Sequence, residues 1–279
     1  MNLSIKEYKN EYESSINNLI SDNTFVREDM LKCLEGYPQH GYVIEDEDEN
    51  EVVAVGVFTE ISKKTSFTLF VKPSQRKKGI GTILLKLLEE KMKNLGVEKI
   101  VCDFKVNESE QAFLYKNGYK PWFHSNFMTY TGGQLAFANY EIVNYEDNFY
   151  YKCQKIFSEA FHKMRLSVGL ESTLSLPSEE NRCSYKENAN NIFILRDNDQ
   201  IVGVLRLDYD EIDSIAVDVT QQGKGYGKAL VSYGVNKLLD RGFSKITLWA
   251  VEGNSAKFLY ENLGFITERT HEFVVKSIK

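Results

Sequence analysis

The chain has 279 residues, of which 42% are hydrophobic and 27% are charged, and its formal net charge at pH 7 is −6. This length favours two domains, and this composition is typical of a packed globular protein and not of a disordered one. The net negative charge offers no basic surface to a phosphate backbone, so we expect no nucleic-acid partner.

The sequence shows no signal for targeting or membrane insertion. Lys6 and Glu7 lie where a signal peptide has its apolar core, and no run approaches the roughly 18 apolar residues of a membrane-spanning helix. The cysteines occur singly, which argues against a zinc site and a disulfide scaffold; they are Cys33, Cys102, Cys153 and Cys183. We therefore expect a cytoplasmic protein that binds neither a membrane nor a metal.

An internal repeat divides the chain. Residues 69–84, LFVKPSQRKKGIGTIL, align with residues 215–230, IAVDVTQQGKGYGKAL, so that two glycines in each stretch match. The stretch AFLYKNGY matches KFLYENLGF, with Tyr115 opposite Tyr260. The repeat predicts two related domains, over residues 1–132 and 138–279, separated by the turn-like residues 131–134.

The predicted elements follow the same order in both halves, and the first half shows it from Leu3 to about Tyr130. In the second half, a strand over 140–145 and a helix near 148–165 precede two strands, 191–197 and 200–208, which Asn198 and Asp199 join by a tight turn. A strand over 211–218 then leads into a glycine loop. The next helix ends at Gly242, and its apolar face is formed by Leu230, Val231, Val235, Leu238 and Leu239. A strand over 245–251, a helix over 255–263 and closing strands over 265–269 and 271–277 complete the half.

The glycine loops predict a phosphate site. A Gly-x-Gly loop between a strand and a helix lets backbone N–H groups meet a phosphate without obstruction by side chains. The P-loop pattern and the dinucleotide pattern both require spacings that these loops lack. The remaining pattern is Arg or Gln, two residues, then Gly-x-Gly, and it occurs twice, as residues 76–81 and 222–227.

With this loop the chain resembles the GNAT family of N-acetyltransferases, and two such domains in one chain resemble its tandem members, such as the mycothiol synthases. The resemblance implies the α/β (α+β) class, with two domains that each have a mixed, mostly antiparallel central sheet flanked by helices. It implies acetyl-CoA as the acyl donor and no metal. The implied coenzyme-binding residues are Ile215, Ala216, Val217, Gln222, Gly223, Lys224, Gly225, Tyr226, Gly227, Lys228, Asn254 and Tyr260 in the second copy, and Leu69, Phe70, Val71, Arg76, Lys77, Lys78, Gly79, Ile80, Gly81, Thr82 and Tyr115 in the first.

The same resemblance implies two catalytic residues in the second copy. A glutamate six residues before the last valine of the strand acts as a general base in some members, and Glu211 stands at this distance from Val217. Strand alternation predicts that Glu211 shares a face with Ile215 and Val217. Tyr260 matches the family tyrosine that protonates the departing thiolate, and Asn254 is expected to cap the following helix and to bind the pantetheine arm.

The first copy departs from this pattern. Thr65 stands where the second copy has Glu211, and Asn107 precedes Tyr115 by a different spacing. We therefore expect the second copy to catalyse direct acetyl transfer to a primary amine, and the first to bind acyl-CoA structurally or to use another base. Alternatives are a non-catalytic acyl-CoA-binding or regulatory protein and a protein N-terminal or lysine acetyltransferase. The acceptor is expected to be a small-molecule amine or a peptide amine, and the chain a monomer or a homodimer.

Overall fold

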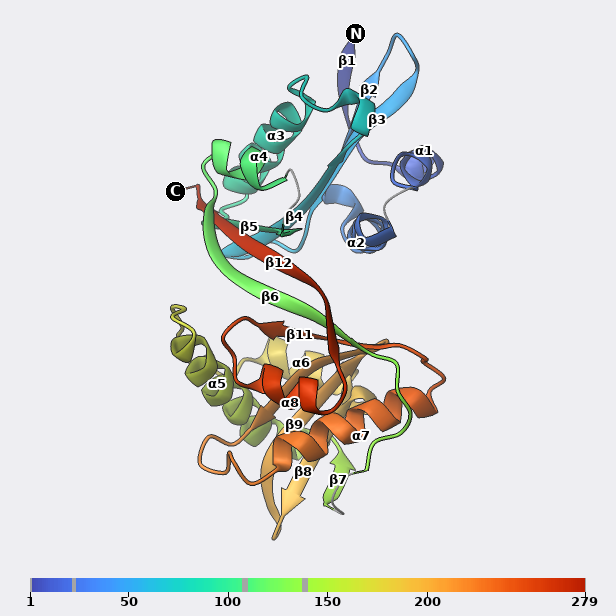
Figure 1. Ribbon diagram of the computed structural model, residues 1–279. Helices are drawn as coiled ribbons and strands as arrows, with labels where there is room; N and C mark the ends of the chain where they lie inside the picture. The colour runs from blue at the N-terminus through green and yellow to red at the C-terminus, as the bar shows by residue number, and fades with distance from the viewer. Residues whose placement is uncertain (1, 22–23, 107–109, 137–139, 279) are drawn as a thin grey trace. The chain divides into compact units, whose positions relative to one another are not determined.

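The computed structural model describes residues 2–21, 24–106, 110–136 and 140–278. The chain forms two compact units, of which unit 1 comprises Met1–Trp122 with Phe273–Lys279, and unit 2 comprises Phe123–Glu272 (Figure 1). Asn107, named above, lies outside the described residues.

Unit 1 is built from strands β1 (Leu3–Glu7), β2 (Gly41–Asp46), β3 (Glu51–Phe58), β4 (Lys64–Val71) and β5 (Lys99–Lys105), and helices α1 (Glu13–Leu19), α2 (Thr24–Gly36), α3 (Ile80–Asn94) and α4 (Glu110–Lys116). Its sheet order is β1-β2-β3-β4-β5, followed by the end of β12 (Ile266–Ser277). The first four strands pair antiparallel, and β4 pairs parallel to β5.

Unit 2 repeats this arrangement with strands β7 (Glu141–Asn144), β8 (Ile192–Asp197), β9 (Gln200–Asp208), β10 (Glu211–Val217) and β11 (Ile246–Val251), and helices α5 (Tyr150–Ser167), α6 (Glu179–Glu187), α7 (Tyr226–Asp240) and α8 (Ala256–Asn262). Strands β7 to β10 pair antiparallel, and β10 pairs parallel to β11. The mixed, mostly antiparallel sheet predicted from sequence is therefore confirmed.

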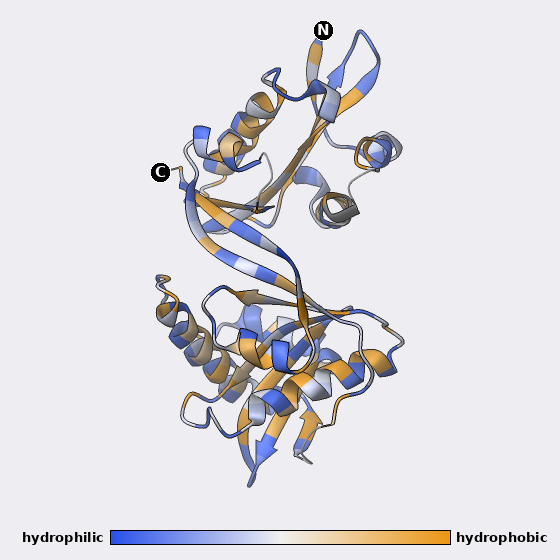
Figure 2. Cartoon of the chain, in the orientation of Figure 1, coloured by the Kyte–Doolittle hydropathy of each residue, from blue (hydrophilic) through white to orange (hydrophobic). Residues whose placement is uncertain are grey.

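Each sheet buries both of its faces. In unit 2 one core lies between the sheet and α7, and the other lies between the sheet and helices α5 and α6. Alternation along β8 supplies both cores, because Phe193 and Leu195 enter the first and Ile192 and Ile194 enter the second. Unit 1 has the same two cores, one under α3 and one under α1 and α2. The strands are accordingly rich in apolar residues (Figure 2).

Each half of the sequence gives a strand to the other half's unit. Strand β6 (Lys120–Tyr130) pairs with β11, and its Met128 and Tyr130 lie in the core of unit 2. The end of β12 puts Val274 into the core of unit 1, where Ile278 follows it. The two units therefore have other bounds than the predicted domains, 1–132 and 138–279. Turn-forming residues show where the chain bends, but they do not show which sheet the preceding strand joins.

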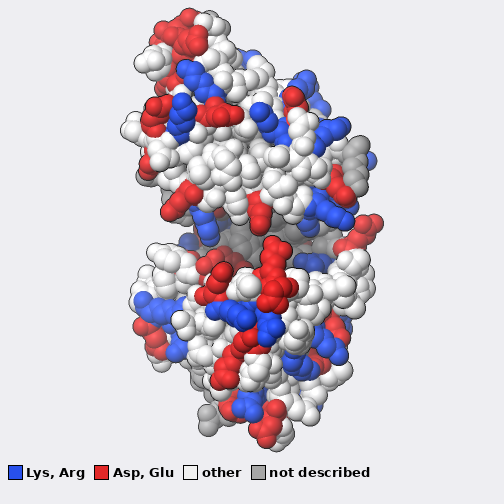
Figure 3. All heavy atoms as spheres, turned by 180° about the vertical axis from the view of Figure 1, so that it is seen from behind, with Lys and Arg blue, Asp and Glu red and all other residues white. Residues whose placement is uncertain are grey.

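The local predictions agree with most elements of unit 2. Asn198 and Asp199 adopt positive φ angles of 48° and 61°, as a tight two-residue hairpin turn requires. Helix α7 buries Leu230, Val231, Val235 and Leu238 completely, while Leu239 is partly buried. The prediction of two closing strands was wrong, because the chain forms one continuous strand, β12, in this region. On the face drawn in Figure 3, acidic and basic side chains are intermixed.

Candidate active site

The site of unit 2 lies where β10 and β11 separate. These parallel strands pair at one position, where Glu211 lies opposite Thr247. Beyond it β10 continues beside β9, with Val217 opposite Gly203. A cavity of about 410 Å³ occupies the opening, lined by residues 214–217 of β10 and by Leu248, Trp249 and Val251 of β11.

The backbone of β10 presents two N–H groups to this opening. The N–H of Asp218 donates to the carbonyl oxygen of Val202 in β9 at 2.9 Å. In an antiparallel pair, every second residue makes such bonds to its neighbour. The N–H groups of Val217 and Ile215 therefore point away from β9, toward the side that β11 leaves unpaired.

A bulge in β10 changes the predicted face of Glu211. The register against β9 shifts between Glu211 and Ser214, and Ile212 packs in the same core as Ile215 and Val217. Alternation from Ile212 thus places Glu211 on the opposite face from Ile215. The prediction that Glu211 shares a face with Ile215 and Val217 was wrong, because it assumed a regular strand. Glu211 lies at the point of separation and is not among the residues that line the cavity.

The glycine loop leaves open space before α7. Gly225, immediately before the helix, has φ 89° and ψ −3°, and Gly223 has φ 84°. Residues with a Cβ adopt this left-handed conformation at a cost of about 1–2 kcal/mol. A Cβ added at either glycine would meet no atom within 4 Å. The first N–H groups of α7 and its dipole therefore face an open space suited to an anion.

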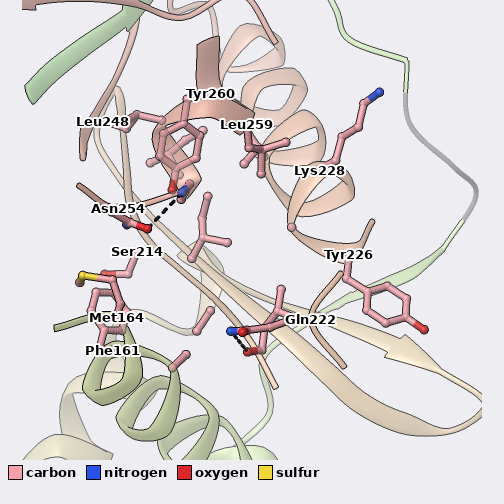
Figure 4. Close-up of a pocket in the computed structure, with 18 of the residues that line it drawn as sticks. Phe161, Met164, Ser214, Gln222, Tyr226, Lys228, Leu248, Asn254, Leu259 and Tyr260 are labelled. Carbon is pink, nitrogen blue, oxygen red and sulfur yellow. Dashed lines mark hydrogen bonds between the residues drawn. The ribbon is translucent and has the colours of Figure 1, made fainter. Parts of the chain in front are cut away.

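Side chains of α5 hold this loop in place. Gln222 donates to the carbonyl oxygen of Val217 at 3.4 Å and accepts from the Lys163 ammonium at 2.8 Å (Figure 4). Lys152 donates to Asp218 at 2.7 Å. The N–H and hydroxyl of Thr220 donate to the other oxygen of Asp218, at 3.0 and 2.7 Å. The loop is thus fixed both to the strand before it and to a helix across the cavity.

We expect the Asp218 contacts to make the stability of unit 2 pH-dependent. The Lys152 ammonium, with the bonds from Thr220, lowers the pKa of Asp218 to about 2. Because this pKa lies below that of the unfolded chain, the stabilisation is present above about pH 4 and is lost as the pH falls toward 2. Asp218→Asn should lower the free energy of unfolding at pH 7 by about 1 kcal/mol, since Lys152 is partly exposed.

Denaturant unfolding of both proteins at several pH values checks this prediction. The difference between wild type and Asp218→Asn should narrow between pH 4 and pH 2. An unchanged difference across this range would contradict the role given to Asp218.

Tyr260 and Asn254 line the cavity from the segment after β11. Burial raises the pKa of Tyr260 to about 12, so its phenol stays protonated throughout the neutral range. Its hydroxyl has no hydrogen-bond partner among the described residues. The Asn254 side-chain oxygen accepts from the N–H of Ala256 at 3.0 Å, which leaves its amide group to the cavity. This bond caps the first turn of α8, as predicted for Asn254, whereas Ser255 has helical φ and ψ angles and makes no side-chain capping bond.

Most of the second-copy residues implied by the resemblance come together in this cavity (Figure 4). Lys224 is an exception: it donates to Gln221 at 2.6 Å and is not among the lining residues. Tyr226 contributes to the lining, while its hydroxyl donates to Asp197 on β8. The remaining lining residues of this set are Ile215, Ala216, Val217, Gln222, Gly223, Gly225, Gly227, Lys228, Asn254 and Tyr260.

Sequence reasoning missed the wall that α5 supplies. Ala160, Phe161 and Met164 line the cavity from this helix. The only sequence signal is an apolar stripe at helical spacing, which is equally typical of core packing. Ser214 also lines the cavity and was likewise not assigned to binding, because the bulge in β10 cannot be read from alternation.

The loop of unit 1 keeps the geometry of its counterpart. Gly79 has φ 89° and ψ −11° before α3, and Lys77 adopts φ 62° where the second copy has Gly223. The Arg76 side chain donates to the carbonyl oxygen of Val71 at 3.1 Å, as Gln222 does to Val217. Lys78 donates to Gln75 at 2.8 Å. The other predicted residues of this copy lie on β4 and at the start of α3, namely Leu69, Phe70, Ile80, Gly81 and Thr82.

The structure corrects the alignment of the two tyrosines. Gly118 and Gly264, which follow α4 and α8 with φ 87° and 99°, stand 146 positions apart, as do the loop glycines Gly79 and Gly225. With the same separation between the two copies, Tyr260 corresponds to Leu114 and not to Tyr115. The N–H of Tyr119 bonds the carbonyl of Leu114 as the N–H of Phe265 bonds that of Tyr260.

Among its described residues, unit 1 thus lacks the tyrosine and the glutamate of the second site. Leu114 is 3% exposed in the core, whereas Tyr115 is 36% exposed on the surface of α4. Thr65 is buried and bonds the carbonyl of Glu60 at 3.2 Å. Phe70, at the position of Ala216, packs its ring among the residues under α1 and α2. The glycine loop is therefore retained in unit 1 without the tyrosine or the glutamate.

A strand pair that separates beside a left-handed glycine loop defines an acyltransferase fold, and comparison with known proteins agrees. The model of the acetyltransferase (GNAT) family matches residues 6–119 and 151–265. The chain belongs to this family, whose donor is acetyl-CoA. Among the described residues, no three His, Cys, Asp or Glu side chains group as metal ligands do, and no described helix has the length and apolar character needed to cross a membrane.

Relatives of assigned function match parts of the chain. Mycothiol acetyltransferase of Kocuria rhizophila is 44% identical over 62 residues, which cover 22% of this chain and 20% of that protein. [Ribosomal protein bS18]-alanine N-acetyltransferase of Haemophilus influenzae is 39% identical over 75 residues, which cover 25% of this chain and 51% of that protein. The chain therefore spans only a fifth of the first relative and about half of the second.

Solved structures match the fold over 99% of the chain. A GCN5-related N-acetyltransferase from Sphaerobacter thermophilus is 17% identical with a TM-score of 0.77, over 96% of its own length. A tandem GNAT protein from the clavulanic acid biosynthesis pathway is 14% identical with a TM-score of 0.67, over 98% of its own length. The tandem architecture predicted from the repeat is confirmed.

Proposed function

We propose that unit 2 is an acetyl-CoA-dependent N-acetyltransferase that transfers the acetyl group to a primary amine directly, without a covalent enzyme intermediate. One observation carries this proposal. The left-handed glycine loop, the strand residues Ile215 and Val217 with unpaired N–H groups, and the Tyr260 phenol all line one cavity.

The residues present suit the coenzyme. The open space before α7, where a Cβ at Gly223 or Gly225 would meet nothing, gives room for a pyrophosphate against backbone N–H groups. The Asn254 amide and the N–H groups of Ile215 and Val217 are donors for the amides of a pantetheine arm and for a carbonyl oxygen. When bound, the thioester supplies an activated acetyl group.

For the neutral amine the reaction forms one C–N bond, breaks one C–S bond and moves one proton from nitrogen to sulfur, and an acceptor that arrives as an ammonium first releases one further proton to water. Glu211, which lies at the point where the strands separate and outside the cavity lining, accepts the proton from nitrogen through a water molecule, and Tyr260 donates a proton to sulfur. The strand N–H groups stabilise negative charge on the carbonyl oxygen. Exchange with water then returns Glu211 and Tyr260 to their starting states.

Initial-rate kinetics with both substrates varied test the direct mechanism. We expect intersecting double-reciprocal lines and no release of thiol without an amine. Parallel lines, or a burst of thiol from the enzyme and acetyl-CoA alone, would show a covalent enzyme intermediate and contradict the proposal.

A peptide amine is the second candidate acceptor, because one relative is named for acetylating an alanine of a ribosomal protein. Assaying peptides beside small amines separates the two. For unit 1 we propose binding without catalysis, since it keeps the loop and has Leu114 and Thr65 in place of the two catalytic side chains. If no amine or peptide supports thiol release while acetyl-CoA binds, the non-catalytic alternative is favoured for the whole chain.

A further inference from the structure

We propose that the acceptor of unit 2 is a cationic primary amine with an apolar group beside the amine, and that Asp213 binds its ammonium group. This inference rests on the proposed function and concerns the same cavity. It follows from how charge and apolar surface are distributed along the cavity wall.

The cavity has one charged residue of each sign, placed far apart. Among the described residues that line it, Asp213 is the single acid and Lys228 the single base. Lys228 lies in the first turn of α7, beside the loop assigned to the pyrophosphate. Asp213 lies near the start of β10, and the strand from there to Val217 is roughly 13 Å long at about 3.3 Å per residue. An anion therefore fits one end and a cation the other.

Asp213 has one carboxylate oxygen left for a ligand. Its Oδ2 accepts from the Ser214 hydroxyl at 2.8 Å and lies 3.6 Å from Nε of Arg206. Arg206 also stacks over the Tyr185 ring at 5.7 Å, so the pair is anchored in the unit. Oδ1 has no partner among the described residues, and the side chain is 41% exposed. A carboxylate held through one oxygen can accept an ammonium with the other.

The cavity wall also carries large apolar side chains. Phe161 and Met164 line the cavity from α5 and Trp249 lines it from β11. In Figure 4, Phe161 and Met164 lie on the side of Ser214, whereas Gln222 and Tyr226 lie toward the other end. Aromatic rings accept an ammonium readily. A carboxylate on the acceptor would be desolvated here beside Asp213, which is unfavourable. Arg165 stacks over Phe161 at 5.8 Å but is not among the lining residues.

Three amines that differ in one feature each test this inference: 2-phenylethylamine, phenylalanine, which adds a carboxylate, and ethanolamine, which lacks the apolar group. We expect kcat/KM for 2-phenylethylamine to exceed both others by about tenfold or more, the usual scale of one charged hydrogen bond. Asp213→Asn should raise KM for 2-phenylethylamine by about tenfold and leave KM for acetyl-CoA unchanged. The matched control is Asp210→Asn, which removes a nearby charge that does not line the cavity, and it should change neither constant.

The outcomes separate the inference from the function on which it rests. The inference is overturned if kcat/KM for phenylalanine or for ethanolamine equals that for 2-phenylethylamine. It is also overturned if the Asp213→Asn enzyme keeps the wild-type preference among the three amines. Either result leaves the proposed acetyltransferase activity in place. Acetyl-CoA binding without turnover of any of the three amines also overturns the inference. Failure of the wild type to bind acetyl-CoA rejects the proposed function itself.

Discussion

Tyr260→Phe is expected to lower kcat by about 10²–10⁴-fold while leaving the affinity for acetyl-CoA within about twofold. The phenol lines the cavity and is the proposed proton donor to sulfur, and its raised pKa of about 12 keeps it protonated at neutral pH. The substitution removes only the hydroxyl, so the ring still packs against Phe265 at 6.1 Å between centroids. Steady-state kinetics and a binding titration on the same preparation check both parts.

Tyr115→Phe is the control for this prediction. Tyr115 is exposed on α4, and the position equivalent to Tyr260 is held by Leu114. We expect wild-type kcat from Tyr115→Phe. A loss confined to Tyr115→Phe would move catalysis to unit 1, and a Tyr260→Phe enzyme with wild-type kcat would remove Tyr260 from the mechanism.

The second large effect is expected from removing residues 273–279. This segment places Val274 and Ile278 in the core of unit 1, and its Lys276 ammonium pairs with Glu89 at 2.8 Å. Burial of the two apolar side chains alone contributes on the order of 5 kcal/mol, comparable with the whole stability of many domains. We therefore expect the truncated chain to lose the folded structure of unit 1, although every removed residue lies at the far end of the sequence.

Calorimetry and limited proteolysis measure this effect. Unit 2 ends at Glu272 by its contacts, so its unfolding transition and its acetyl-CoA binding should persist in the truncated protein. Val274→Ala offers a milder version, with an expected loss of about 1–3 kcal/mol in unit 1. A truncated protein whose first unit unfolds at the wild-type temperature would contradict the strand exchange.

The features predicted correctly are those that local residues determine. Conformational preferences within a few residues determine the positive φ angles at Asn198 and Asp199, the apolar face of α7 and the left-handed glycine before α3 and before α7. The glycine loop also appears twice in one chain, which strengthened its assignment. Together these signals were enough to predict the fold class and the position of the two glycine loops.

The missed features depend on backbone irregularity or on distant contacts. The bulge after Glu211 follows no residue pattern in β10, yet it changes which side chains reach the cavity. The tyrosine alignment failed because the letters FLY occur in both copies, whereas the left-handed glycine after each helix is the structural anchor. The exchange of β6 and β12 is a pairing between segments more than 100 residues apart, for example Tyr130 with Ile246.

The central claim, that the glycine loop of unit 2 holds acetyl-CoA, is tested most directly by calorimetric titration of wild type, Gly225→Val and Gly79→Val with acetyl-CoA. The two glycines share φ 89°, and an added Cβ meets nothing within 4 Å at either, so the substitutions impose the same backbone strain in the two units. We predict that Gly225→Val abolishes binding to the site that supports turnover, while Gly79→Val leaves turnover at the wild-type rate. Wild-type affinity and turnover in Gly225→Val would contradict the claim.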